Sequence, residues 1–217
     1  MTRKLMVFEL LLVAAAMAAT AVLYSHLPPR VTTHWGLNGR PNGYSPRWMM
    51  WVLGPGFLAG ISLLTAVLPW LSPRRFEVSS FRSTYLFIMT AVFVMMGYIY
   101  GVVLWAGSGR HMDIADIVRA VQGAVCLFFA VIGNVMGKVQ RNFFIGVRTP
   151  WTLASERVWR ATHRFAARCM VAAGLLGLVL VLAGVQLASI AVILAGALAP
   201  VVYSLVYYKH LERCGGL

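Results

Sequence analysis

The residues best suited to chemistry lie in one stretch, RTPWTLASERVWRATHR, from Arg148 to Arg164. It holds four arginines, two tryptophans, a histidine and a proline in seventeen positions, within a chain that is 60% hydrophobic. His163 is a candidate acid or base, with Glu156 or Arg148 as its neighbour. On one helix, however, Glu156 and His163 are two turns apart, about 10.5 Å along the axis, too far for a direct hydrogen bond. Because no nucleophile or metal-ligand cluster completes a site, we expect no enzyme activity, no cofactor and no metal.

A turn and a helix must position these residues. Pro150 lacks an amide hydrogen and fixes φ, which places it in a turn or the first turn of a helix. Ser155 is a good helix N-cap, and Glu156 behind it puts negative charge at the positive end of the helix dipole. We therefore expect a helix from Ser155 onward that enters the membrane near Cys169. Within it, His163 is expected to bond a loop carbonyl and so to tie the loop to the helix.

The arginines of this helix share one face. At 100° per residue, four of them fall within about 80° of arc: Arg157, Arg160, Arg164 and Arg168. Such a stripe attracts anionic lipids of the inner leaflet at about 1 kcal/mol per residue. Anionic lipid is therefore an expected partner, although it does not account for the loop residues Arg148 to Thr152.

The rest of the chain is mostly apolar. Only 12% of its residues are charged, and several apolar runs reach the roughly 20 residues that a helix needs to cross a bilayer. The runs are continuous rather than alternating, which favours helices over strands. We predict an all-α, polytopic membrane protein with a six-helix bundle, its spans at 5–24, 48–71, 85–105, 114–136, 169–187 and 188–208. The expected organisation is an N-terminal two-helix unit (1–71), central helices three and four (72–136), and a last motif with helices five and six (137–217).

The positive charge follows this topology. Of the nineteen Lys and Arg residues, fourteen fall on one side of the predicted membrane. By the positive-inside rule, that side and both termini are cytoplasmic. Topology accounts for the net charge of +13, so no nucleic-acid partner is expected. The first span resembles a secretory signal as well, but its length favours retention as a membrane helix.

The first outside loop, residues 26–47, is expected to be ordered. Asn38-Gly39 and Asn42-Gly43 are tight-turn signals. His34 and Trp35 would form the tip of this loop. Two interpretations remain open: a structured lid with an aromatic anchor, or a surface that receives an extracellular ligand.

Glu9 is an acid about one turn into the first span. Charged groups at such depth usually face a partner. Arg148 or Arg141 is the expected partner, and the alternative is that Glu9 reaches water beside Arg3 and Lys4.

The block from Gly133 to Arg164 resembles the hallmark cytoplasmic segment of the bacterial SdpI family. The matching residues are Asn142, Gly146, Arg148, Thr149, Pro150, Trp151, Thr152, Leu153, Trp159, Thr162, His163 and Arg164. The outside stretch VTTHWGLNGRPNGY, with His34, Trp35 and Gly39, resembles a His-Trp-containing domain of unknown function common in such proteins. The resemblance implies a multi-pass protein of the bacterial cytoplasmic membrane. It also implies resistance to a secreted peptide toxin and capture of a cytoplasmic repressor.

Two other functions stay open. A small-solute transporter or channel would need polar lining, and the spans offer few ionisable residues beyond Glu9, Asp116 and Arg119. A membrane enzyme would have to use the segment from Arg148 to His163.

Overall fold

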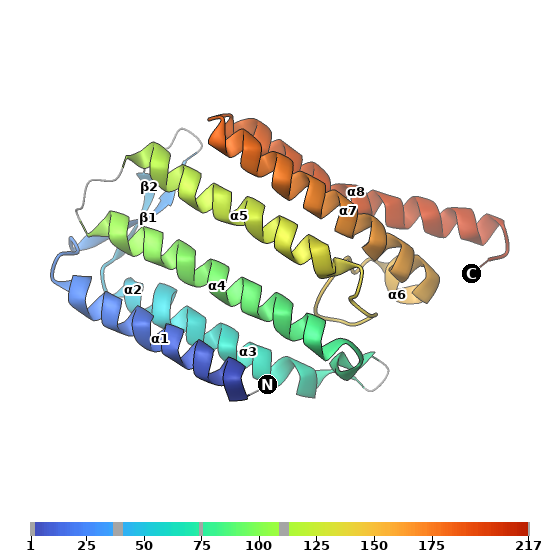
Figure 1. Ribbon diagram of the computed structural model, residues 1–217, viewed down its shortest axis with the longest axis horizontal. Coiled ribbons are helices and arrows are strands. Elements are labelled where there is room, and N and C mark those ends of the chain that lie inside the picture. The colour runs from blue at the N-terminus through green and yellow to red at the C-terminus, as the bar shows by residue number, and fades with distance from the viewer. Residues whose placement is uncertain (1–2, 37–40, 74–75, 109–112, 217) are drawn as a thin grey trace. The chain divides into compact units, whose positions relative to one another are not determined.

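The structure of the protein is a computed structural model, which describes residues 3–36, 41–73, 76–108 and 113–216 (Figure 1). Six helices in the described residues are long and apolar enough to cross a membrane, which confirms the predicted fold class. They are α1 (Arg3–Tyr24), α2 to α3 (Met49–Trp51 and Phe57–Leu71), α4 (Arg82–Gly107), α5 (Ile114–Met136), α7 (Glu156–Leu182) and α8 (Gln186–Arg213). The short helix α6 (Pro150–Ala154) and the strands β1 (Arg30–Trp35) and β2 (Pro41–Pro46) complete the fold. The orientation of the termini stays a prediction.

The second span is not a regular α-helix throughout. A π-helical turn, Val52–Gly56, joins α2 to α3 and contains Pro55. Proline has no amide hydrogen to give to the helical ladder, which accounts for an irregular turn at this place. Similarly, a 3-10 turn, Val78–Phe81, leads into α4.

The chain forms two compact units. The first comprises Met1–Ala66 and Val92–Ala124. Only Glu9 and Thr20 of α1 are buried, and they lie on one side of the helix. The Thr20 and Tyr100 hydroxyl groups are 2.5 Å apart, so a hydrogen bond joins α1 to α4. Polar contacts therefore hold α1 in its unit, while its other side chains suit a lipid environment.

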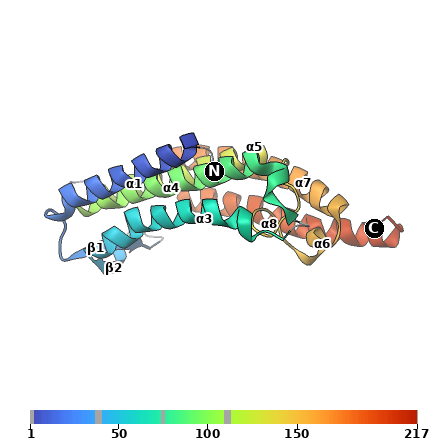
Figure 2. The ribbon, with the colours of Figure 1, turned by 90° about the horizontal axis from the view of Figure 1, so that it is seen from below.

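A β-hairpin follows α1 in the first unit (Figure 2). Its antiparallel strands pair Arg30 with Pro46 at one end and Trp35 with Pro41 at the other. A core beneath it consists of Leu27, Val31, Met50, Tyr100 and Leu104. In its described residues, 26–36 and 41–47, the loop between the first two spans thus has regular structure, as the sequence predicted.

One turn assignment in this hairpin was wrong. Asn42 and Gly43 lie inside β2, and neither has a positive φ. Gly43 pairs with His34 next to two irregularities in the register. Pairing with β1 and packing on the core outweigh the local turn preference of Asn-Gly. The other predicted turn, Asn38-Gly39, lies outside the described residues.

The second unit comprises Val67–Ala91 and Val125–Leu217. In it α7 and α8 lie side by side as an antiparallel pair (Figure 1). The predicted spans, 169–187 and 188–208, meet after residue 187, but α7 ends at Leu182 and α8 already begins at Gln186. Gly184 adopts a φ of 80° directly after α7, a left-handed position at which glycine ends helices. The turn is therefore earlier in the chain than predicted.

The start of α7 agrees with the sequence. Ser155 is its N-cap and accepts a hydrogen bond from the Val158 amide, and Glu156 is in the first turn. The 27 residues of α7 would be about 40 Å long, more than the roughly 30 Å of hydrocarbon in a bilayer. The helix is thus long enough for its first turns to extend beyond the membrane core.

Candidate functional site

The candidate site is the segment between α5 and α7 with the first turns of α7, residues 138–164, which we call the loop motif. Asn142 closes its first turn. Its Nδ2 donates to the carbonyls of Gln140 and Ile145 at 2.8 and 3.0 Å, and its Oδ1 accepts from the amides of Phe144 and Ile145 at 2.7 Å each. The side chain is fully buried. The Asn142 side chain therefore supplies hydrogen-bond partners to loop amides and carbonyls that have no partner in a regular helix or strand.

His163 ties this loop to α7. Its Nε2 accepts a hydrogen bond from the Val147 amide at 3.1 Å, and its Nδ1 lies 2.9 Å from the Trp159 carbonyl. An acceptor at Nε2 and a donor at Nδ1 define a neutral imidazole protonated at Nδ1. The tie is the expected one, but the loop group is an amide and not a carbonyl. Because both ring nitrogens face backbone groups, His163 is poorly placed to exchange protons with a substrate.

Gly146 makes room for that imidazole. Its φ is 110°, a conformation that side-chain-bearing residues rarely adopt. A Cβ at this position would lie 2.2 Å from His163 Nε2. Glycine is therefore required here for both conformation and space.

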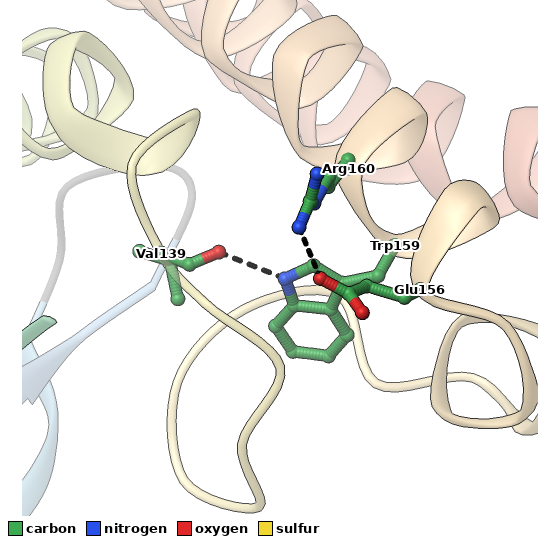
Figure 3. A network of polar contacts seen from close by, with 4 residues as sticks. All are labelled: Val139, Glu156, Trp159 and Arg160. Atoms are coloured by element: carbon green, nitrogen blue, oxygen red, sulfur yellow. Dashed lines mark hydrogen bonds and ion pairs between the residues drawn. The ribbon is translucent and has the colours of Figure 1, made fainter. Parts of the chain in front are cut away.

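Trp159 fixes the other end of the loop. Its indole Nε1 donates to the Val139 carbonyl at 2.8 Å (Figure 3), and its ring stacks on that of His163 with centroids 4.0 Å apart. Both side chains are buried. On the exposed side of the same helix, Arg160 pairs with Glu156 (Figure 3). The inward aromatic pair holds the loop, while the charged pair remains in solvent.

The Thr149-Pro150 turn starts α6. Thr149 is the N-cap, Pro150 follows in the first turn, and the side chains of Thr149 and Thr152 form a capping box. Thr152 Oγ1 also donates to the Val147 carbonyl at 2.8 Å. The Thr149 hydroxyl is 3.1 Å from that of Ser204, which lies on α8. The turn is thus joined directly to the last membrane helix.

Arg148 and Phe143 form an exposed pair in the loop between α5 and α6. Arg148 and Phe143 are both exposed, and the Arg148 guanidinium donates to the Phe143 carbonyl. The Phe143 ring meets that of Phe76 edge to face, with centroids 4.4 Å apart. The Arg141 guanidinium lies 5.4 Å from the Phe76 ring centroid and donates to the Leu153 carbonyl at 3.2 Å. The segment before α4 therefore contacts the exposed pair through Phe76. Trp151, the next aromatic residue of the motif, is half-buried.

The arginine stripe lies on the surface as expected. All four of its members, Arg157, Arg160, Arg164 and Arg168, are exposed. The opposite side of the helix is buried, including Val158, Thr162 and Ala166. The stripe is therefore open to a ligand or to lipid.

Within its own unit Glu9 is bound by a serine, and its pairing with Arg141 or Arg148, which belong to the second unit, stays a prediction. Glu9 is fully buried, and Ser62 Oγ on α3 donates to its Oε2 at 2.5 Å. Its Oε1 has no hydrogen-bond partner among the described residues. In the second unit, the guanidinium groups of Arg141 and Arg148 donate to loop carbonyls. Full burial also shows that the alternative, contact with water, was wrong.

The hairpin presents polar and aromatic side chains. His34 is exposed, and its Nδ1 lies 2.5 Å from Asn42 Oδ1. Tyr44 and Trp48 are 57% and 53% exposed, as suits aromatic residues at a membrane interface. Trp35 ends β1, and Gly39 lies outside the described residues.

In the part of the chain that the structure describes, no three His, Cys, Asp or Glu side chains are grouped to hold a metal ion. Sequence reasoning missed Ser62, Ser204 and Phe76 as partners of the motif residues and of Glu9. The two serines interrupt apolar runs, and a polar residue within a span is the signal that could have revealed them.

Comparisons with known proteins cover both regions. Residues 138–204 match the SdpI/YfhL protein family, and residues 11–59 match a domain of unknown function, DUF1648. The chain is 23% identical to Immunity protein SdpI of Bacillus subtilis (strain 168) over 217 residues, which cover 97% of each chain. No solved structure matches the chain. The resemblance seen in the sequence is thus confirmed: the chain carries an SdpI/YfhL family segment after an N-terminal DUF1648 segment, and it is similar to Immunity protein SdpI along nearly its whole length.

Proposed function

We propose that the chain is an immunity protein of the bacterial cytoplasmic membrane, which protects the cell that makes it from a secreted peptide toxin. The observation that carries this proposal is the similarity to Immunity protein SdpI over 97% of both chains. Since the similarity runs the whole length, it includes both the hairpin and the loop motif.

The two ordered regions face opposite sides of the membrane in this proposal. The hairpin follows one of the six candidate spans and the loop motif follows four. Seven of the chain's Lys and Arg residues lie between 138 and 168, so the positive-inside rule places the loop motif in the cytoplasm. The hairpin is then outside, where a secreted peptide first arrives.

The hairpin is suited to meet an amphipathic peptide. Val31 of its strand β1 is fully buried, as is Met50 of α2, while Tyr44 and Trp48 remain exposed. The Arg47 guanidinium lies 4.9 Å from the Tyr24 ring centroid, and the Tyr24 and Trp51 rings are 6.1 Å apart. A fixed surface with exposed aromatic residues can bind a partner at a small entropic cost.

The experiment compares toxin-sensitive cells with and without the chain. Both are exposed to culture medium from the producing bacterium, and their membrane potential is followed with a dye. The chain should prevent most of the depolarisation, and Tyr44→Ala should reduce this protection at equal protein level. Leu198→Ala, at an exposed aliphatic position of α8, is the matched control. Equal depolarisation with and without the chain would reject the immunity role.

A specific observation favours a second, cytoplasmic role, the capture of a repressor. Phe143, which is 40% exposed, and Arg148 lie at the surface of the loop between α5 and α6. Aromatic and arginine side chains are frequent anchors of protein interfaces. Because Thr149 bonds to Ser204 on α8, a movement of that helix would reach the adjacent Arg148.

Photo-crosslinking tests this role. A photoreactive amino acid at position 143 should yield a covalent product with a soluble regulator in toxin-treated cells. The same amino acid at position 198 should yield none. If position 143 gives no protein product, the capture of a repressor is rejected while the immunity role stands.

A further inference from the structure

One face of α7 carries arginines in its first turns and aliphatic side chains after them. At 100° per residue, Arg164, Arg168, Leu175 and Val179 fall within about 60° of arc. All four are exposed, Leu175 at 54% and Val179 at 61%. From Arg168 to Val179 the helix rises about 16 Å, close to the depth of one leaflet of a roughly 30 Å hydrocarbon layer. The face is therefore charged at one end and apolar over the depth of a lipid chain.

The two arginines nearest the apolar part differ from the other two of the stripe. Arg157 donates to the Gly216 carbonyl at 3.3 Å, and Arg160 pairs with Glu156. Across the described residues, no ion pair involves Arg164 or Arg168. Their charges are thus available to an anion.

A third cation lies nearby, and the acids of this unit are engaged elsewhere. Gly137 is next to Arg164, since a Cβ on it would lie 3.8 Å from Arg164 Cγ, and the exposed Lys138 follows directly. The acids of the unit have other partners: Glu77 accepts from Ser79, Glu156 pairs with Arg160 and Glu212 pairs with Lys209. This end of α7 therefore has an excess of positive charge.

We propose that Arg164, Arg168 and Lys138 bind the phosphate of an anionic phospholipid whose acyl chains lie along Leu175 and Val179. Guanidinium groups match phosphate oxygens in geometry and charge. The aliphatic continuation of the same face selects a lipid over a soluble phosphate, because only a lipid covers both parts. This site does not depend on the proposed immunity function.

Native mass spectrometry of the full chain in a neutral detergent tests the site. The probes are phosphatidylglycerol, phosphatidylcholine with the same acyl chains, and glycerol 1-phosphate. Phosphatidylglycerol should bind most tightly and glycerol 1-phosphate least. The double variant Arg164→Gln/Arg168→Gln should weaken phosphatidylglycerol binding about 30-fold, from about fivefold per arginine, and leave phosphatidylcholine binding unchanged.

The matched control removes the same charge from the same helix face. Arg157→Gln/Arg160→Gln should change the affinity by less than about threefold, because these arginines have partners of their own. Leu175→Ser/Val179→Ser should weaken binding of phosphatidylglycerol but not of glycerol 1-phosphate. If the double arginine variant does not fold, Arg168→Gln alone should still show a loss of about fivefold.

Several results would overturn the proposal. Equal binding of the two phospholipids, or an equal loss in both arginine pairs, would show that no local headgroup site exists. Glycerol 1-phosphate binding as tight as that of phosphatidylglycerol would assign the arginines to a soluble anion. Dimers of the chain in place of lipid adducts would assign the face to a second copy.

Discussion

The replacement of His163 by phenylalanine tests whether the imidazole holds the loop motif to α7. Phenylalanine keeps the ring stacked on Trp159 but removes both hydrogen bonds. Leaving the Val147 amide without an acceptor costs about 1–3 kcal/mol, and losing the bond to the Trp159 carbonyl costs about 1 kcal/mol. We therefore expect His163→Phe to lower the free energy of unfolding by about 3 kcal/mol. At 2–4 °C per kcal/mol for a chain of this size, the melting temperature should fall by about 6–12 °C.

The assay is thermal unfolding in detergent, followed by tryptophan fluorescence, with amide hydrogen exchange of residues 142–149. Exchange should become faster in the variant, because the loop loses its contact with α7. His210→Phe, at an exposed position of α8, is the matched control and should melt like the wild type. Gly146→Ala disturbs the same contact, so its effect should not add to that of His163→Phe. A His163→Phe protein that melts within about 1 °C of the wild type, with unchanged exchange, would refute the reasoning.

Three other predictions concern the loop, the buried acid and the topology. Asn142→Ala removes four hydrogen bonds and should destabilise the protein by about 3 kcal/mol in the same assay; an unchanged melting temperature would contradict this. Glu9→Gln and Ser62→Ala should be non-additive, with a coupling of about 0.6–1.7 kcal/mol, whereas strict additivity would show that the two do not interact. In a cysteine-free background, Tyr44→Cys should react with an impermeant maleimide in intact cells and Phe143→Cys only after permeabilisation. Labelling of position 143 from outside would reverse the topology.

The division of the loop motif into inward and outward residues bears on how variants should be interpreted. Asn142, Gly146, Thr152, Trp159 and His163 make contacts within the protein, and four of them have fully or nearly fully buried side chains. We therefore expect a replacement of any of them to perturb folding, and with it any function of the segment. Variants at exposed positions such as Phe143 or Arg148 are therefore the informative ones for partner binding.

Local signals in the sequence determined the membrane helices. The thickness of the hydrocarbon layer sets the length of an apolar run, so the six spans could be placed from composition alone. Ser155 and Glu156 correctly predicted the start of α7, because a helix cap is formed by residues that are neighbours in the sequence. The arginine stripe followed from the helical period in the same way. The turn before α8 was misplaced because its only local signal is Gly184, within an apolar stretch.

Only the tertiary structure decided which polar groups meet. Glu9 and Ser62 are 53 positions apart and Thr149 and Ser204 are 55 apart, and no periodicity links residues on different helices. For Glu9, charge suggested an arginine, whereas the partner within its own unit is a serine that helix packing brings to it. Likewise, Asn42-Gly43 has the sequence of a turn and forms part of a strand, since pairing with β1 depends on residues distant from the dipeptide. Helix and turn propensities depend on neighbouring residues, and the bilayer thickness sets the length of each apolar run, so both can be read from the sequence. Hydrogen bonds between helices depend instead on how the helices pack.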